Sequence, residues 1–239
     1  INGFTVKKSP FSIGSTTEYL LGYYFIQDPT SMYACEVLKP RKGETVLDMA
    51  AAPGGKTTYL SQIMRNTGVV IAIELNRNRM KSFRSNISRL GISNVIGIRM
   101  NALDTSDLGI KFDSVLIDAP CTGTGTSFKN PEVKLKGIGD VENCTVKQRN
   151  FLEVGARVLK KGGSMVYCTC SLLPEENELM VQYALNELDL EMDTISYGDP
   201  AITSVYGKTL SLEINKARRF YPRMHNTQGF FIAKMIKVR

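Results

Sequence analysis

The sequence predicts an α/β fold built on a mostly parallel, doubly wound sheet. Two observations support this prediction: short apolar runs alternate with segments of helical periodicity, and the polar residues suited to chemistry follow those runs. The chain has 239 residues, 43% of them hydrophobic, which fits one domain with one sizeable core. Because ligands of such sheets bind beyond the carboxyl ends of the strands, a site is expected there.

The elements follow one another in the order expected for such a sheet. Asp28 as N-cap and Pro29 in the first turn indicate a helix that continues over residues 31–38. Short apolar runs predict strands over residues 45–49, 69–74, 95–100, 114–118 and 164–170. Apolar residues at helical spacing predict helices over residues 56–64, 77–90, 148–159 and 175–188. A last strand, residues 229–236, is expected to be antiparallel because it follows a long return connection.

Composition restricts the possible functions. A formal charge of +7 favours a polyanionic partner such as nucleic acid. No apolar run is long enough to cross a bilayer, and the first residues lack the order of a signal peptide, so we expect a soluble, cytoplasmic protein with no membrane partner. Five cysteines, an odd number spread along apolar segments, argue against a disulfide framework. Cys168 and Cys170 are too close for a zinc knuckle and His225 is the only histidine, so no metal is expected.

The turn after the first strand is a candidate for ligand binding. Gly55-Lys56-Thr57 matches the end of a phosphate loop, but Ala50 replaces the first glycine of that motif and Pro53 removes a backbone donor. Two adjacent glycines let a ligand approach the backbone closely, which favours binding over a plain strand-to-helix connection. The turn comprises Ala50, Ala51, Ala52, Pro53, Gly54, Gly55 and Lys56.

Acidic and amide residues follow the next two strands. Glu74 ends the second strand, where a carboxylate can accept hydrogen bonds from ribose hydroxyls. After the third strand, either Asn101 or Asp104 is a candidate for contact with an adenine ring. Asn101 suits that role because an amide can both donate to the ring nitrogen and accept from the exocyclic amine. These residues indicate a nucleotide-like ligand.

Two cysteines follow the later strands. Cys121 comes after Asp118-Ala119-Pro120, and Cys170 lies in Thr169-Cys170-Ser171. A thiolate is a strong carbon nucleophile near neutral pH, so two thiols beside a nucleotide-like ligand indicate covalent catalysis on an electrophilic ring carbon, such as C6 of cytosine. The alternative for each is an inert, buried cysteine. We expect Cys168 to be structural and to point to the opposite face of its strand from Cys170.

In these motifs the chain resembles the Nop/Sun family of RNA cytosine-5 methyltransferases, which use S-adenosyl-L-methionine. The resemblance covers nearly the whole chain and implies a Rossmann-like class I methyltransferase fold, with a mostly parallel seven-stranded sheet and helices on both faces. We expect residues 1–40 to form a short N-terminal leader packed on the catalytic domain, residues 41–239. The motifs are Ala51-Ala52-Pro53-Gly54-Gly55-Lys56-Thr57, Asp118-Ala119-Pro120-Cys121-Thr122-Gly123-Thr124-Gly125, Thr169-Cys170-Ser171 with Glu175-Glu176-Asn177, and Arg219-Phe220-Tyr221-Pro222 with His225 and Gly229-Phe230-Phe231-Ile232-Ala233.

The resemblance implies a role for each site residue. Cys170 would be the nucleophile, whose addition to C6 turns C5 into an enamine carbon able to accept a methyl group, and Cys121 would assist product release. Asp118 is a reasonable contact for cytosine N3, with Lys56 as the alternative. The family often has an aspartate where this chain has Asn101, so Asn101 and Asp104 both stay open for the adenine contact. The residues expected to bind S-adenosyl-L-methionine are Ala50, Ala51, Ala52, Pro53, Gly54, Gly55, Lys56, Glu74, Asn101 and Asp118.

The partner indicated by charge and motifs is structured RNA, with tRNA favoured over rRNA. Cations alternate with aromatic residues between Lys216 and Arg223, and Lys129, Lys134 and Lys136 follow Cys121, which suits phosphate binding and base stacking. A solvated basic surface is the alternative. The competing functions are a non-catalytic RNA-binding assembly factor with the same fold, and a methyltransferase acting on small molecules or proteins. The last of these leaves the two thiols and the basic charge without a role.

Overall fold

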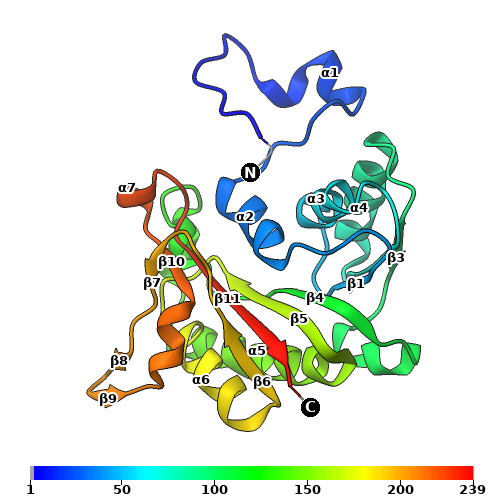
Figure 1. Cartoon of the computed structure of the whole chain (residues 1–239). Coiled ribbons are helices and arrows are strands. Elements are labelled where there is room, and N and C mark those ends of the chain that lie inside the picture. The colour runs from blue at the N-terminus through cyan, green and yellow to red at the C-terminus, as the bar shows by residue number, and fades with distance from the viewer. Residues whose placement is uncertain (1–2, 239) are drawn as a thin grey trace.

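The computed structural model describes residues 3–238 and contains a large mixed sheet (Figure 1). Its strands lie in the order β3-β2-β1-β4-β5-β11-β10-β7, and β6 also pairs with β11. The parallel strands are β1 (Thr45–Asp48), β2 (Val69–Ile73), β3 (Val95–Ile98), β4 (Phe112–Asp118) and β5 (Leu159–Thr169). The strands β6 (Leu190–Asp193), β7 (Asp199–Pro200), β10 (Arg218–Phe220) and β11 (Phe230–Lys237) pair antiparallel with their neighbours. The predicted α/β fold is confirmed.

The number of strands differs from the expected seven. Strands β1 to β6 and β11 supply seven, and β7 and β10 extend the edge so that the sheet within the described residues has nine. These two additions are only two and three residues long, which is too short for a periodic sequence pattern. Two further short strands, β8 (Ser204–Val205) and β9 (Lys208–Thr209), form a separate hairpin.

Helices cover both faces of the sheet (Figure 1). The helices α2 (Pro29–Leu38), α3 (Gly55–Ile63) and α4 (Arg77–Arg89) lie on one face, and α5 (Ile138–Val158) and α6 (Glu178–Glu187) lie on the other. Successive side chains of a strand point to opposite faces, and β4 shows the result. Leu116 packs in the core with α2 and α3, whereas Val115 and Ile117 pack in the core with α5 and α6.

Short helices fill the connections. They are α1 (Thr17–Leu20), α7 (Pro222–His225), and the 3₁₀ helices η1 (Ile13–Ser15), η2 (Ala102–Leu108), η3 (Thr124–Thr126), η4 (Pro131–Leu135) and η5 (Leu212–Lys216). None of the helices in residues 3–238 is long and apolar enough to span a bilayer.

The predicted starts of three elements move by three residues or more, and one of them is β5, which begins at Leu159 rather than at residue 164. Helix α5 begins at Ile138 rather than at residue 148. The apolar pattern misses this earlier start because the first turns of the helix are mostly exposed and carry little apolar periodicity. Helix α6 begins at Glu178 rather than at residue 175. The turn that precedes α6 holds two buried side chains, Glu176 and Asn177, which bond to the site loops.

The segment before β1 contacts the rest of the domain along much of its length. The Asp28 carboxylate accepts a hydrogen bond from the Thr30 backbone N–H at 3.0 Å, so Asp28 is the N-cap that the sequence predicts for α2. Helix α2 packs on α3 and on the central strands. Farther back, the Arg89 guanidinium at the end of α4 lies 4.0 Å from the centre of the Tyr19 ring and donates to the Tyr24 carbonyl at 3.1 Å. The boundary at residue 40 stays a prediction.

Candidate active site

The carboxyl ends of β4 and β5 bring the two predicted cysteines together. Asp118, the last residue of β4, lies opposite Cys168 of β5 in the parallel register. The loops that leave these two strands therefore start side by side, and each carries one cysteine. The Sγ atoms of Cys121 and Cys170 are 3.3 Å apart.

The two thiols have opposite electrostatic settings. The hydrogen bond from Cys121 lowers the pKa of Cys170 from its ordinary value, against the effect of burial. The same hydrogen bond, together with burial, raises the pKa of Cys121 well above its ordinary value. These opposite pKa shifts favour ionisation of Cys170 over ionisation of Cys121. Since the thiolate is the nucleophilic form, this arrangement favours Cys170 as the attacking sulfur.

A partly buried ion pair lies at the end of β4, where its charges act on Cys170. Lys56 Nζ and Asp118 Oδ2 are 2.7 Å apart, with side chains 12% and 33% exposed. Burial is the largest single influence and lowers the pKa of Lys56, but the charge and hydrogen bond of Asp118 together with the neighbouring Cys168 and Cys35 outweigh burial, and the net result is a raised pKa. Lys56 is therefore a cation at neutral pH. The exposed part of Asp118 can reach a ligand at this edge.

Cys168 is close to this pair and corrects one expectation. Its Sγ lies 3.6 Å from Asp118 Oδ1, and its side chain is fully buried. Residues two apart on a strand share a face, so the expectation that Cys168 points away from Cys170 is wrong: both pack against the same apolar cluster.

The predicted cofactor turn joins β1 to α3. Gly54 has a φ of +109°, a left-handed conformation that favours glycine, and it precedes the first residue of α3. Asp48, at the end of β1, accepts from Thr57 Oγ1 at 2.7 Å and from the Ala50 N–H at 3.3 Å, which ties both ends of the turn to one carboxylate. Burial raises the pKa of Asp48 to about 6. These contacts hold the strand-to-helix turn at both ends, and binding of a ligand by its backbone stays a prediction.

Glu74 and Asn101 lie at the ends of the next strands, as predicted. The Glu74 side chain is buried, and its Oε1 accepts from the Asn76 N–H at 2.7 Å. Asn101 Oδ1 accepts from the Leu103 N–H at 3.2 Å and so caps η2, whereas Asp104 is exposed in the first turn of that helix. A contact of Asn101 with adenine would therefore use its Nδ2. A buried acid beside a glycine turn fits a ribose-bearing cofactor.

One residue predicted to contact RNA is instead part of the framework. Arg219 is 3% exposed and forms a two-pronged ion pair with the buried Glu178, with Nε to Oε1 at 2.5 Å. Its Nη1 also donates to the Leu172 carbonyl at 3.0 Å, in the loop that follows Cys170. The prediction that Arg219 contacts RNA is wrong, because the β10–β11 register turns this side chain inward.

Among the other cations predicted to contact RNA, some have partners within the protein and others are exposed. Lys129 is paired with Asp28 at 3.3 Å, and Lys136 Nζ donates to the Thr122 carbonyl at 2.7 Å. Lys134 and Arg223 are exposed. Across residues 3–238, no group of His, Cys, Asp or Glu is arranged to hold a metal ion.

The turn before β11 closes the thiol loops from the side of the last strand. The Gly229 N–H donates to the Gly125 carbonyl at 2.9 Å, and the Gly125 N–H donates to the Cys170 carbonyl at 2.9 Å. A Cβ added to Gly125 would lie 2.3 Å from the Gly229 carbonyl oxygen, so this contact requires glycine. The entry to β11 and both cysteine loops therefore form one packed unit.

Several known proteins are similar in sequence to this chain. A family model described as 16S rRNA methyltransferase RsmB/F matches residues 35–236. A 28S rRNA (cytosine-C(5))-methyltransferase of Mus musculus is 41% identical over 244 residues, which cover 99% of this chain and 31% of the relative. A tRNA (cytosine(72)-C(5))-methyltransferase of Pyrococcus horikoshii is 40% identical over 229 residues, which cover 95% of this chain and 56% of the relative. The chain thus spans about a third to about half of the length of these relatives.

Solved structures show the same fold. A methyltransferase homologue from Pyrococcus horikoshii superposes with a TM-score of 0.90 at 49% identity, covering 97% of this chain and 74% of that one. NSun6 from Pyrococcus horikoshii, solved with SFG, superposes with a TM-score of 0.85 at 38% identity, covering 95% of this chain and 56% of that one.

Proposed function

Because the chain belongs to the RsmB/F methyltransferase family, and with it to the Nop/Sun family whose motifs it carries, we propose that it methylates C5 of a cytosine in structured RNA with S-adenosyl-L-methionine. The observation that carries the proposal is the pair of thiols 3.3 Å apart, of which Cys170 is favoured for ionisation. Relatives named for rRNA and for tRNA cytosines support this class of substrate.

The first step is addition of Cys170 to the ring. Its thiolate forms a bond to C6, and the electron pair of the C5–C6 double bond moves towards C5 and N3. Asp118 and Lys56, an ion pair at 2.7 Å beside the thiols, are the groups that can hydrogen-bond N3 during this shift. When bound, S-adenosyl-L-methionine supplies the electrophilic methyl group that C5 accepts.

Release then falls to Cys121. The first cause of its raised pKa is the hydrogen bond to Cys170, and that cause disappears once the Cys170 sulfur is a thioether. Cys121 therefore becomes easier to ionise after addition, and its thiolate can remove the C5 proton. The electron pair re-forms the C5–C6 double bond, and Cys170 leaves as a thiolate.

Cofactor binding is assigned to the edge formed by β1, β2 and β4. The Ala50 to Lys56 turn offers its backbone, Glu74 is placed for the ribose hydroxyls, Asp118 lies nearest the thiols, and Asn101 is proposed for the adenine. The structure of NSun6 with SFG, an analogue of S-adenosylmethionine, supports this cofactor for the family. These residue assignments stay predictions.

For the substrate we propose tRNA, with rRNA as the alternative. Two relatives named for tRNA cytosines, 40% and 34% identical to this chain, support the proposal. The experiment below compares both RNAs.

The test is methyl transfer from labelled S-adenosyl-L-methionine to separate tRNA and rRNA fractions, followed by mass spectrometry of the nucleosides. We expect 5-methylcytosine in the tRNA fraction and none with a Cys170→Ala variant. Label found only in the rRNA fraction would show that the substrate is rRNA and not tRNA. Binding of cofactor and RNA without any 5-methylcytosine would identify a non-catalytic RNA-binding factor.

A further inference from the structure

A fully buried carboxylate, that of Glu176, accepts two hydrogen bonds from Thr122, the residue that follows Cys121. Glu176 lies in the turn before α6 and is 0% exposed. Its Oε1 accepts from the Thr122 backbone N–H at 2.7 Å, and its Oε2 accepts from Thr122 Oγ1 at 2.5 Å. Both oxygens of this carboxylate thus hold one residue of the Cys121 loop. The sequence motif contains Glu176, but two adjacent acids gave no signal as to which of them is buried.

The same loop is tied on both sides of Cys121. Gln148 of α5 donates from Nε2 to the Pro120 carbonyl at 2.9 Å and to Glu176 Oε1 at 3.3 Å. Lys136 Nζ donates to the Thr122 carbonyl at 2.7 Å. The residues before and after Cys121 are therefore both anchored, which fixes the place from which its side chain reaches Cys170.

A buried carboxylate is an expensive way to hold a loop. Desolvation of an ion costs several kcal/mol unless its lone pairs are well satisfied, and here three donors from two residues satisfy them. An apolar residue could fill the space, but it could not orient Thr122. The negative charge of Glu176 also adds to the causes that raise the pKa of Cys121, after the Cys170 contact and burial. The Glu176 carboxylate thus influences both the position of the Cys121 side chain and the pKa of its thiol.

The Cys170 loop is held by a different set of bonds. Asn177 Nδ2 donates to the Ser171 carbonyl at 3.0 Å, and Asn177 Oδ1 accepts from Thr169 Oγ1 at 2.6 Å. Thr122 Oγ1 also lies 3.5 Å from Ser171 Oγ, a longer contact than the 2.5 Å bond from Thr122 Oγ1 to Glu176. A change at Thr122 therefore acts on the Cys121 loop through the shorter bond and reaches the Cys170 loop only through Ser171.

We propose that Glu176 is a positioning residue that acts through Thr122 to hold Cys121 against Cys170 and so sets the rate of product release. The inference rests on the proposed function, in which Cys121 serves the release step. It adds two residues, Glu176 and Thr122, to those that determine the outcome of the reaction.

The test compares Thr122→Val, which removes the hydroxyl donor but keeps the shape, with Thr122→Ser, which keeps the hydroxyl. A denaturation-resistant protein–RNA adduct is measured on gels, and multiple-turnover methylation is followed alongside. With Thr122→Val we expect the adduct to accumulate and turnover to slow roughly tenfold or more, since a hydrogen bond to a charged group is lost. Thr122→Ser is expected to restore turnover. Glu176→Gln is compared with Glu175→Gln, which serves as the matched control. Glu175 does not contact Thr122 but accepts a hydrogen bond from the Tyr206 hydroxyl at 2.7 Å.

A second measurement needs neither RNA nor cofactor. The rate of alkylation of Cys170, located by mass spectrometry, is followed against pH in each variant. If Thr122 places Cys121, Thr122→Val weakens the hydrogen bond that lowers the pKa of Cys170, and the alkylation midpoint moves to higher pH. A merely structural role would leave this midpoint unchanged.

The outcomes separate the two proposals. Wild-type turnover and a wild-type alkylation midpoint in folded Thr122→Val overturn the positioning role. A shifted midpoint without an adduct in any variant, including Cys121→Ala, supports the positioning of Cys121 but overturns the proposed chemistry. If thermal melting shows that Thr122→Val does not fold, Lys136→Met removes the tether on the Thr122 carbonyl, and it must shift the midpoint in the same direction for the proposal to stand.

Discussion

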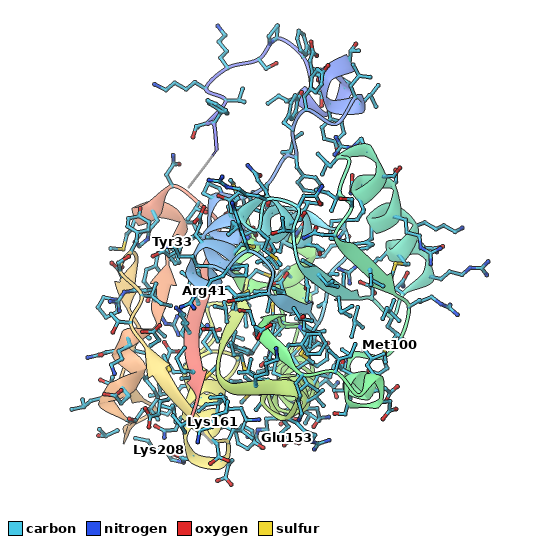
Figure 2. All side chains as sticks on the ribbon, turned by 45° about the vertical axis from the view of Figure 1, so that its right-hand side comes forward. Tyr33, Arg41, Met100, Glu153, Lys161 and Lys208 are labelled. Atoms are coloured by element: carbon cyan, nitrogen blue, oxygen red, sulfur yellow. The ribbon has the colours of Figure 1, made fainter. Side chains whose placement is uncertain are left out.

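The two ends of the parallel strands both carry charged residues, but in different settings. At the carboxyl end, Glu176, Glu178 and Arg219 are buried and fully engaged. At the amino end, the Lys160–Asp113 pair is 45% and 31% exposed and borders a cleft of about 730 Å³. Figure 2 shows Lys161, of the same cleft, at the end of the molecule away from the N-terminal segment.

This difference explains why the cleft at the amino end is not the active site. Burying an ion is costly, so a buried ion persists where it holds a geometry, whereas a solvated ion costs little and fixes little. The thiols and the ion pair of Lys56 lie at the buried, carboxyl end, and the cleft lies at the solvated, amino end. We therefore place the active site by the setting of its charges and thiols rather than by the volume of a cavity.

The largest expected effect separates the two thiols at the carboxyl end. Cys170→Ala should abolish both methylation and the covalent adduct, because no sulfur remains to add to C6. Cys121→Ala should still add and methylate but should accumulate a denaturation-resistant adduct, because elimination slows. The double variant should behave like Cys170→Ala. Denaturing gels with and without nuclease measure this, and an adduct that builds up in Cys170→Ala would reverse the roles.

The next effect is on stability, and it compares the two ends directly. Arg219→Ala leaves the buried Glu178 carboxylate without its partner and should lower the free energy of unfolding by about 3–5 kcal/mol. Lys160→Ala removes a cation from an ion pair at the solvated end and should change it by no more than about 1 kcal/mol. Urea denaturation of both variants tests this contrast. Equal losses would show that burial does not distinguish the two ends.

A pH effect should arise from Asp48. Its folded-state pKa of about 6 lies above its ordinary value of 3.8, so the folded protein binds this proton more tightly than the unfolded chain does. The contribution of Asp48 to stability is therefore present below about pH 4 and is lost as pH rises to about 6. Comparison of wild type with Asp48→Asn at pH 4 and pH 7 measures it. The difference between the two proteins should change in that interval, and a constant difference would contradict the raised pKa.

The smallest effect concerns RNA affinity. Arg223→Ala, at the exposed turn near the carboxyl end, should flatten the logarithmic salt dependence of RNA binding by roughly 0.7 to 0.9 for a single phosphate contact. Lys161→Ala removes the same charge at the amino end and should leave the slope unchanged. Filter binding over a range of salt concentrations decides between them. The comparison fails if both variants flatten the slope equally.

The sequence predicts those parts of the molecule whose signals are local. The parallel strands, the glycine turn and the Asp28 cap have recognisable patterns, and the structure has each of them at the expected place. The identity of Arg219 as a framework residue does not follow from sequence, because Arg218 and Arg223 have the same charge and only the buried ion pair with Glu178 distinguishes Arg219. The contact between the thiols likewise depends on two loops separated by 49 residues.

The position of β11 has a consequence for how the protein is made. This strand, which comes last in the described chain, lies between β5 and β10 and also pairs with β6. Until it has left the ribosome, the edge of β5 stays unpaired, and the Gly229 contact that closes the cysteine loops cannot form. Such long-range pairing slows folding, so the thiol pair is expected to be assembled late, after the parallel strands. A nascent chain would thus carry both cysteines before it carries the site that distinguishes them.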